Sequence, residues 1–335
     1  MRIVVDDKIP YIHEKLALLA DEVVYLRGAD ITAGDVKDAD ALIVRTRTRC
    51  DRQLLEGSKV QLVATATIGF DHIDTDYMQQ SGIAWTNCPG CNADSVAQYL
   101  ECSLLLLEQQ KGLVLNESTI GIVGCGHVGS RVKRVAERLG MRVLVCDPLL
   151  GNPEYVSMEV IEREADVITF HVPLTREGQY ATLHLGNDAF FHRLARVPYI
   201  INTSRGEVVD NDALLAALQE GRVRDAVIDV WEHEPDLSLE LLQRVFIGTP
   251  HIAGYSADGK VNADNMVIDA LCRHFHLPHP GLIQPPALPD DFEDTGSPLD
   301  YYNPLQDSFQ LKKEPSKFEK LRNNYPIRRE KVHTL

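Results

Sequence analysis

Three glycines at fixed spacing mark the clearest candidate binding site in the sequence. Gly124, Gly126 and Gly129 follow a strand-like run at 119–123 and open a helical pattern that ends at Gly140. In a dinucleotide-binding turn, the first glycine allows the tight turn, the second lets the backbone approach a pyrophosphate, and the third lets helix and strand pack closely. The helix N-terminus also offers free N–H groups and a positive dipole end. The pattern therefore predicts a dinucleotide site.

An acidic residue at the end of the next predicted strand indicates which dinucleotide binds. Asp147 follows the run 141–146. At this distance from the glycines, an acidic side chain hydrogen-bonds the adenine-ribose hydroxyls, and its charge disfavours the extra phosphate of NADP. We therefore expect NAD.

Three polar segments follow later predicted strands and hold the residue types that hydroxyl oxidation needs. They span 202–206, 229–235 and 249–254. A histidine can take the hydroxyl proton near neutral pH, a neighbouring carboxylate can orient its ring, and an arginine can hold a substrate carboxylate. One residue alone proves little, because most of the 12 histidines are expected at the surface or in the core. Together the segments predict a dehydrogenase.

The elements that must position these residues form two alternating sets of strands and helices. This alternation predicts an α/β fold with two doubly wound parallel-sheet domains and a small C-terminal segment. We expect one α/β domain at 1–94 and 256–283, a Rossmann NAD-binding domain at 95–255, and a separate C-terminal region at 284–335. The predicted strands are 2–6, 23–26, 41–45, 62–67, 83–87, 119–123, 142–146, 166–170, 199–202 and 226–230.

Composition limits the choice of partner and compartment. The net charge of -15 disfavours nucleic acid, and no apolar run approaches the roughly 20 residues that span a bilayer. The seven cysteines are an odd, scattered set, which is typical of reduced thiols in the cytoplasm. The pair Cys88 and Cys91 has no second pair or histidines at ligand spacing, so we expect no metal.

Several motifs resemble the D-isomer-specific 2-hydroxyacid dehydrogenase family along nearly the whole chain. They are VDDKIPY, VATATIGFDHID, NCPGCNADSVAQY, GIVGCGHVGSR with VCDP, TFHVPL, INTSRGEVVDN, IDVWEHEP and IGTPHIAGYSADGK. The resemblance implies that Arg205, Glu234 and His251 are the catalytic trio, with His251 as proton donor or acceptor. Together with the glycine pattern above, the resemblance implies a set of cofactor contacts. They are Gly124, Gly126, His127, Val128, Gly129, Asp147, Val172, Thr203, Ser204, Arg205, Asp229 and Gly254. Val172 stands where relatives can carry a threonine.

The resemblance also implies a phosphorylated small 2-hydroxy acid as substrate. It implies that 1–94 and 256–283 form a flavodoxin-like substrate-binding domain and that 284–335 is a C-terminal dimerisation region through which a homodimer is built. Thr46, Thr67 and Tyr255 match substrate contacts. Arg45, Arg47 and Arg49 alternate, so on an extended strand end they would share one side and could cradle a phosphate; a solvated basic edge strand is an equal alternative.

Other interpretations stay open from the sequence. A dehydrogenase for phosphoglycerate, glycerate or lactate would use the same trio. A NAD-gated corepressor shares the fold, and a purely structural α/β protein fits the glycine fingerprint poorly.

Overall fold

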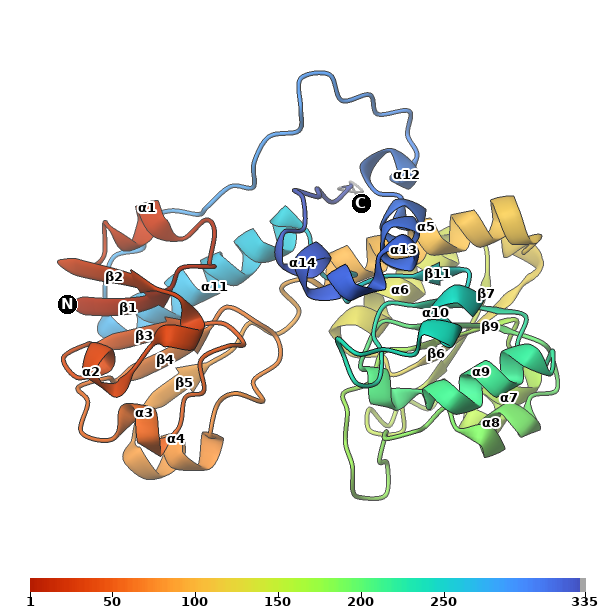
Figure 1. The fold of residues 1–335 in the computed structure, drawn as a ribbon, viewed down its shortest axis with the longest axis horizontal. Coiled ribbons are helices and arrows are strands. Elements are labelled where there is room, and N and C mark those ends of the chain that lie inside the picture. Colours follow the sequence, from red (N-terminus) through yellow and green to blue (C-terminus); the bar gives the residue numbers. More distant parts are fainter. Residues whose placement is uncertain (332–335) are drawn as a thin grey trace. The chain divides into compact units, whose positions relative to one another are not determined.

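The computed structural model describes residues 1–331, which divide into two compact units (Figure 1). Unit 1 comprises residues 1–92 and 256–289, and unit 2 comprises residues 93–255 together with the chain from 290 onward. Each unit holds one sheet in which every strand pair is parallel. This arrangement confirms the predicted α/β fold with two parallel sheets.

The sheet of unit 1 has the strand order β2-β1-β3-β4-β5. Its central strands are buried on both faces, which is why they read as apolar runs rich in Val, Ile and Leu. One face packs on α11 through Val267, Ile268 and Leu271, and the other packs on the short helices that follow β2, β3 and β4. The elements are β1 (Arg2–Asp6), α1 (His13–Leu16), β2 (Glu22–Leu26), η1 (Gly28–Asp30), α2 (Ala33–Val36), β3 (Ala41–Val44), α3 (Arg52–Leu55), β4 (Leu62–Thr65), α4 (Thr75–Ser81), β5 (Ala84–Thr86) and α11 (Ala257–Phe275).

The sheet of unit 2 has the order β11-β10-β9-β8-β6-β7. The chain runs from β6 outward to β7 and then returns to the other side of β6 as β8, and such a reversal opens a ligand crevice at the carboxyl ends of the strands. The elements are α5 (Ala93–Lys111), η2 (Leu115–Glu117), β6 (Thr119–Val123), α6 (His127–Arg138), β7 (Arg142–Cys146), α7 (Met158–Glu164), β8 (Val167–Phe170), α8 (Asp188–Arg193), β9 (Tyr199–Asn202), η3 (Gly206–Val208), α9 (Asn211–Gln219), β10 (Asp225–Ile228), α10 (Leu239–Arg244) and β11 (Ile247–Gly248).

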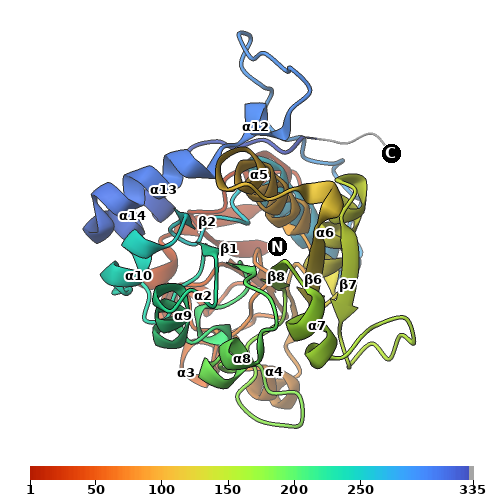
Figure 2. The same ribbon diagram turned by 90° about the vertical axis from the view of Figure 1, so that its right-hand side faces the viewer.

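Helices cover both faces of this second sheet. On one face α5 and α6 lie side by side and bury a cluster that includes Leu104, Ile122 and Val132 (Figure 2). On the other face α7, α8, α9 and α10 close a cluster around Phe170 and Phe190. Two closed faces leave the strand ends as the place for polar chemistry.

The helices between 298 and 323 pack on the rest of unit 2. Ser308 of α13 accepts a hydrogen bond from the Gly248 amide at 2.9 Å, and Leu311 and Phe318 are buried in the same cluster as Phe170. This region contains α12 (Pro298–Tyr301), α13 (Pro304–Lys313), η4 (Pro315–Lys317) and α14 (Phe318–Asn323). Among the described residues, no helix is both long and apolar enough to cross a bilayer.

Two local features differ from what the sequence predicts. Strand β11 was missed because two residues show no periodicity. The arginine run does not continue strand β3. The chain turns at 46 and 47 instead, and Thr48 is buried with its hydroxyl donating to the Gly28 carbonyl at 2.7 Å.

Candidate active site

The glycine loop has the backbone that a close-packed nucleotide turn requires. Gly124 has a φ of +88°, and a Cβ there would lie 2.6 Å from the carbonyl oxygen of His171. A Cβ on Gly129 would lie 2.0 Å from the carbonyl oxygen of Gly124, so only glycine lets α6 start this close to β6. A Cβ on Gly126 would meet nothing within 4 Å. The loop is therefore tightly held at Gly124 and Gly129 and open at Gly126.

The loop leads directly into α6, whose first residues face solvent. Gly126 is the N-cap, His127 is exposed and Val128 is half-buried. Asp147, at the end of the neighbouring strand β7, accepts hydrogen bonds from the amides of Cys125 at 2.8 Å and Leu149 at 3.2 Å. The half-buried carboxylate thus lies against the glycine loop, and a carboxylate retains further acceptor positions for ribose hydroxyls.

Further residues predicted to contact the cofactor lie at the same strand ends. Thr203 follows β9, and its hydroxyl oxygen is buried without a hydrogen-bond partner among residues 1–331. Val172 follows β8, and its Cγ1 would lie 2.8 Å from a Cβ on Gly124. Ser204 instead donates from both its amide and its hydroxyl to Oδ1 of Asn202, which fixes the turn. An open glycine turn, a helix N-terminus and an unpartnered hydroxyl fit a bound dinucleotide.

His251 and Glu234 form a hydrogen-bonded pair. Nδ1 of His251 lies 2.8 Å from Oε2 of Glu234, and Oε1 of Glu234 accepts the Trp231 amide at 3.0 Å. Burial acts to raise the pKa of Glu234, but the hydrogen bond and charge of His251, the Trp231 amide and Arg322 outweigh it and lower that pKa. The carboxylate is therefore ionised at neutral pH and orients the imidazole.

The backbone of His251 is held in an unusual conformation by Asp229. His251 has a φ of +57°, a region that residues with a Cβ seldom adopt, and its amide donates to the Asp229 carbonyl at 2.8 Å. The Asp229 carboxylate accepts the Thr249 hydroxyl at 2.6 Å and the amides of Ile252 at 2.8 Å and Ala253 at 3.0 Å. Asp229 was predicted to contact NAD. Its side chain is 1% exposed and is occupied in shaping the loop around His251.

Arg205 lies in the turn after β9, which packs directly on the loop that carries Glu234. A Cβ on Gly206 would lie 2.0 Å from the Trp231 carbonyl oxygen, and the Asp229 amide donates to the Asn202 carbonyl at 3.0 Å. Arg205 is exposed, with Nη1 donating to the Ser204 carbonyl at 2.8 Å. Because β9, β10 and β11 are neighbours, the trio shares one edge of the sheet.

Trp231 joins the loops and was missed by sequence reasoning. It is 2% exposed, and its Nε1 donates to the Thr249 carbonyl at 2.9 Å while its amide holds Glu234. A tryptophan inside IDVWEHEP could have suggested a buried anchor, because a buried indole N–H needs an acceptor.

Two arginines of the C-terminal segment also reach these loops, and no local sequence pattern indicates either contact. Nη2 of Arg328 donates to the Ala253 carbonyl at 2.6 Å, and Nε of Arg322 donates to the Tyr255 hydroxyl at 3.1 Å. Gly254 lies between these two anchored residues of the loop. Tyr255, predicted to bind substrate, is half-buried.

The other predicted substrate residues belong to unit 1. Thr46 and Thr67 follow the neighbouring strands β3 and β4, so they share one sheet edge. Thr46 is exposed, whereas the Thr67 hydroxyl contacts the Thr65 hydroxyl at 2.6 Å and donates to the Gly69 carbonyl at 2.9 Å. Nη1 of Arg45 donates to the Lys8 carbonyl at 3.2 Å. Within residues 1–331, no three His, Cys, Asp or Glu side chains are grouped as metal ligands.

Known proteins resemble this chain over nearly its whole length. Residues 105–253 match the family model of the D-isomer specific 2-hydroxyacid dehydrogenase NAD binding domain. An erythronate-4-phosphate dehydrogenase from Bacteroides thetaiotaomicron is 55% identical, over 98% of this chain and 97% of that protein. A second, from Cronobacter sakazakii, is 41% identical, over 98% and 92% of the two chains.

A solved structure extends the likeness to three dimensions. The NAD⁺-bound 3-phosphoglycerate dehydrogenase of Entamoeba histolytica has a TM-score of 0.69 and 29% identity, over 86% of this chain and 99% of that chain. The matched family domain spans the glycine loop and all three residues of the trio. Together with the nearly full-length relatives, this match identifies the chain as an NAD-dependent dehydrogenase. The chain belongs to the erythronate-4-phosphate dehydrogenase family, a branch of the D-isomer-specific 2-hydroxyacid dehydrogenases.

Proposed function

We propose that this chain oxidises the 2-hydroxyl of 4-phosphoerythronate to the 2-oxo acid with NAD, a step toward pyridoxal phosphate. The observation that carries the proposal is the 2.8 Å contact between His251 and Glu234, found in a chain that resembles enzymes named for this activity along nearly its whole length. Lactate, glycerate and phosphoglycerate are the competing substrates.

In the proposed reaction, His251 is the general base. Its Nδ1 faces Glu234, which leaves Nε2 to take the proton of the substrate hydroxyl. Arg205 pairs with the substrate carboxylate and stabilises charge on the oxygen that becomes the carbonyl. In the reverse direction the same nitrogen returns the proton.

The glycine loop, the start of α6, Asp147 and Thr203 would hold NAD. When bound, NAD supplies the acceptor for the hydride that leaves C2 of the substrate. Cys125 contributes its amide to Asp147, so the loop and the ribose-binding carboxylate are fixed together before the cofactor arrives.

Recognition of the phosphate is assigned to the strand ends of unit 1. Arg45 is the proposed partner of the phosphate, with Thr46 and Thr67 beside it, and Tyr255 is the proposed substrate contact of unit 2. The chain turns at 46 and 47 instead of continuing as a strand, so the strand alternation that would place the three arginines on one side does not apply. This favours Arg45 alone over a three-arginine cradle.

We also propose a cytoplasmic homodimer that does not bind nucleic acid or membranes. The seven cysteines and the net charge of -15 support the compartment and the lack of nucleic acid. Sedimentation at micromolar concentration measures the assembly, and a monomer there would contradict the dimer.

A substrate panel tests the proposed activity. NADH formation is followed with 4-phosphoerythronate, 3-phosphoglycerate, glycerate and lactate at matched concentrations. We expect kcat/KM to be highest for 4-phosphoerythronate and turnover to be lost in His251→Gln. A higher kcat/KM for another acid would reassign the substrate, and turnover unchanged in His251→Gln would refute the mechanism. NAD binding without turnover of any acid would favour a NAD-sensing protein.

A further inference from the structure

The C-terminal segment places a charged side chain against the catalytic pair. Arg322 lies in α14, and its Nη1 is 3.9 Å from Oε2 of Glu234, the oxygen that faces Nδ1 of His251. Its Nε donates to the Tyr255 hydroxyl at 3.1 Å, and its guanidinium carbon lies 5.9 Å from the centroid of the Tyr255 ring. One guanidinium thus contacts both a residue of the predicted trio and the predicted substrate tyrosine.

This contact is largely withdrawn from solvent. The side chains of Arg322 and Glu234 are 23% and 19% exposed. Burial alone would lower the pKa of Arg322, but Tyr255, Glu234 and Glu319 more than reverse that effect, and Arg322 in turn helps to lower the pKa of Glu234. Charges in such a setting interact more strongly than at an open surface.

The position of Arg322 is fixed from both sides along the chain. Before it, Phe318 is 1% exposed in the core of unit 2. After it, the Tyr325 hydroxyl donates to Asp307 at 2.8 Å, and Arg328, 4% exposed, donates to the carbonyls of Ala253 and Ser95. A segment anchored at both ends holds Arg322 in one place.

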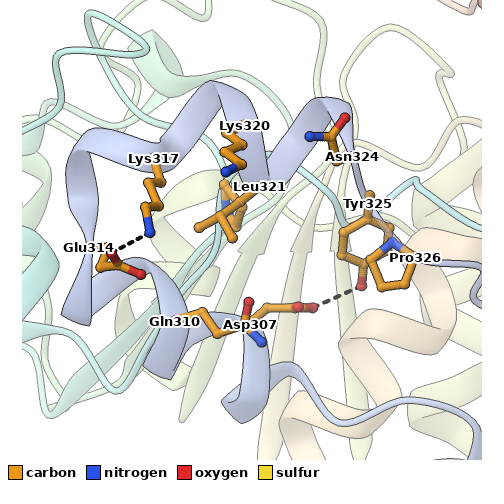
Figure 3. A pocket seen from close by; sticks show the side chains of 10 residues that line it. Asp307, Gln310, Glu314, Lys317, Lys320, Leu321, Asn324, Tyr325 and Pro326 are labelled. Carbon is orange, nitrogen blue, oxygen red and sulfur yellow. Dashed lines mark hydrogen bonds and ion pairs between the residues drawn. The ribbon is translucent and has the colours of Figure 1, made fainter.

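The same segment also carries charged side chains that do not contact the catalytic pair. A pocket of about 270 Å³ is lined by residues of α13, α14 and the chain after α14. In this pocket Lys317 pairs with Glu314, and the Tyr325 hydroxyl donates to Asp307 (Figure 3). Lys320 lines this pocket, is exposed, and lies two residues from Arg322 on the same helix. It offers a matched cation that does not contact Glu234.

We propose that Arg322 is a positioning residue of the active site, which orients Glu234 toward His251 and fixes the hydroxyl of Tyr255. The inference rests on the proposed dehydrogenase activity. It assigns to the C-terminal segment a direct part in that site, separate from any part in assembly.

The effect of removing Arg322 on the pH profile depends on the charged and polar groups around Glu234. They are the His251 imidazole, the Trp231 amide and the Arg322 guanidinium, with Tyr255 and Glu319 facing Arg322 in turn. Removing one positive charge makes an added proton on the Glu234–His251 pair more favourable. Because the general base must be unprotonated for oxidation, the acidic limb of the pH profile should move to higher pH.

The test compares Arg322→Gln, Arg322→Lys and the control Lys320→Gln in the full-length chain. For Arg322→Gln we expect kcat/KM for the hydroxy acid to fall roughly tenfold to hundredfold, the KM for NAD to stay within about twofold, and the acidic limb to move upward. Arg322→Lys should return the limb toward that of the parent, and Lys320→Gln should match the parent.

The outcomes separate this inference from the proposed function. Turnover by the unsubstituted chain tests the function, whereas the ratio of variant to parent and the pH profile test Arg322. A pH profile of Arg322→Gln that superposes on that of the parent would overturn the inference, even if the rate falls. If Arg322→Gln melts below the assay temperature, Arg322→Lys decides: a parental rate and profile support the charge assignment, and a loss as deep as that of a His251→Gln variant contradicts it.

Discussion

Oε2 of Glu234 lies 2.8 Å from Nδ1 of His251, while its other oxygen is held by the amide of Trp231. The carboxylate therefore has no freedom to turn away from the imidazole. This contact leaves Nε2 of His251 for the substrate. A substitution that keeps the shape of Glu234 but removes its charge therefore tests what the charge contributes.

Replacing Glu234 by glutamine keeps the shape and removes the charge. We expect kcat/KM in the oxidation direction to fall by about a hundredfold or more, as is typical when the partner of a catalytic histidine is neutralised. Without the negative charge, a proton on the facing ring is less favourable, so the acidic limb of kcat/KM against pH should move downward. This is opposite to the shift expected for Arg322→Gln.

Steady-state rates across pH 5 to 9 would measure both effects. Glu240→Gln, an exposed carboxylate in α10, is the control for the loss of one charge. An acidic limb that moves upward in Glu234→Gln would contradict the assignment of charge.

The contact between Asp147 and the glycine loop leads to a prediction about cofactor choice. Asp147→Asn can still accept the Cys125 amide through its side-chain oxygen but no longer repels a 2′-phosphate. We expect the ratio of kcat/KM for NADP to that for NAD to rise by roughly tenfold, about 1.4 kcal/mol. An unchanged ratio would place Asp147 outside the ribose site, and Asp147→Ala would show the cost of losing the loop contact as well.

A buried carboxyl in unit 1 predicts a dependence of stability on pH. Asp264, on α11, is 1% exposed and accepts the Tyr11 amide at 3.1 Å. Burial raises its pKa from 3.8 to about 7, against the smaller lowering effects of the Tyr11 amide, Arg45 and Lys260. Between these values the folded state holds a proton that the unfolded state has lost, so the contribution of Asp264 to stability falls as the pH rises from about 4 to about 7.

Asp264→Asn removes that dependence, because the amide cannot ionise and still accepts the Tyr11 amide. We expect its Tm to exceed that of the parent at pH 8, where the gain is on the order of 1–4 kcal/mol, and to approach the parental Tm near pH 4. Thermal unfolding at the two pH values measures this, with Asp269→Asn on the same helix as an exposed control. A Tm lowered equally at both pH values would refute the titration of Asp264.

The parallel sheets could be predicted because strands buried on both faces appear in the sequence as continuous apolar runs. Runs such as Ile3 to Val5 and Ile120 to Val123 are apolar on both faces, and the helices between them have their own period. Short elements were not predictable. Strand β11 has two residues and α1 has four, so neither is long enough for its repeat to recur.

Some residues of the candidate site could likewise be predicted from the sequence, and others could not. The glycine spacing and the position of Asp147 are local patterns with a known physical purpose. Arg322 and Arg328 instead act through contacts with loops far earlier in the chain, such as Tyr255, 67 residues before Arg322, and Ala253, 75 residues before Arg328. No periodicity records such a pairing. Asp229 was singled out from the sequence, but its role could not be predicted. Its carboxylate holds the loop of His251 through amides that only the fold brings to it.

Unit 1 has a further consequence for how the molecule is made. Its first strand shares one buried cluster with Val267 and Ile268 of α11, more than 260 residues later, and all of 93–255 is synthesised between them. A growing chain therefore presents one unclosed face of the first sheet until α11 has been translated, whereas most of unit 2 is continuous. Because distant contacts form slowly, closure of unit 1 should be a late event in folding, and the interval before it is when the nascent protein most needs protection from aggregation.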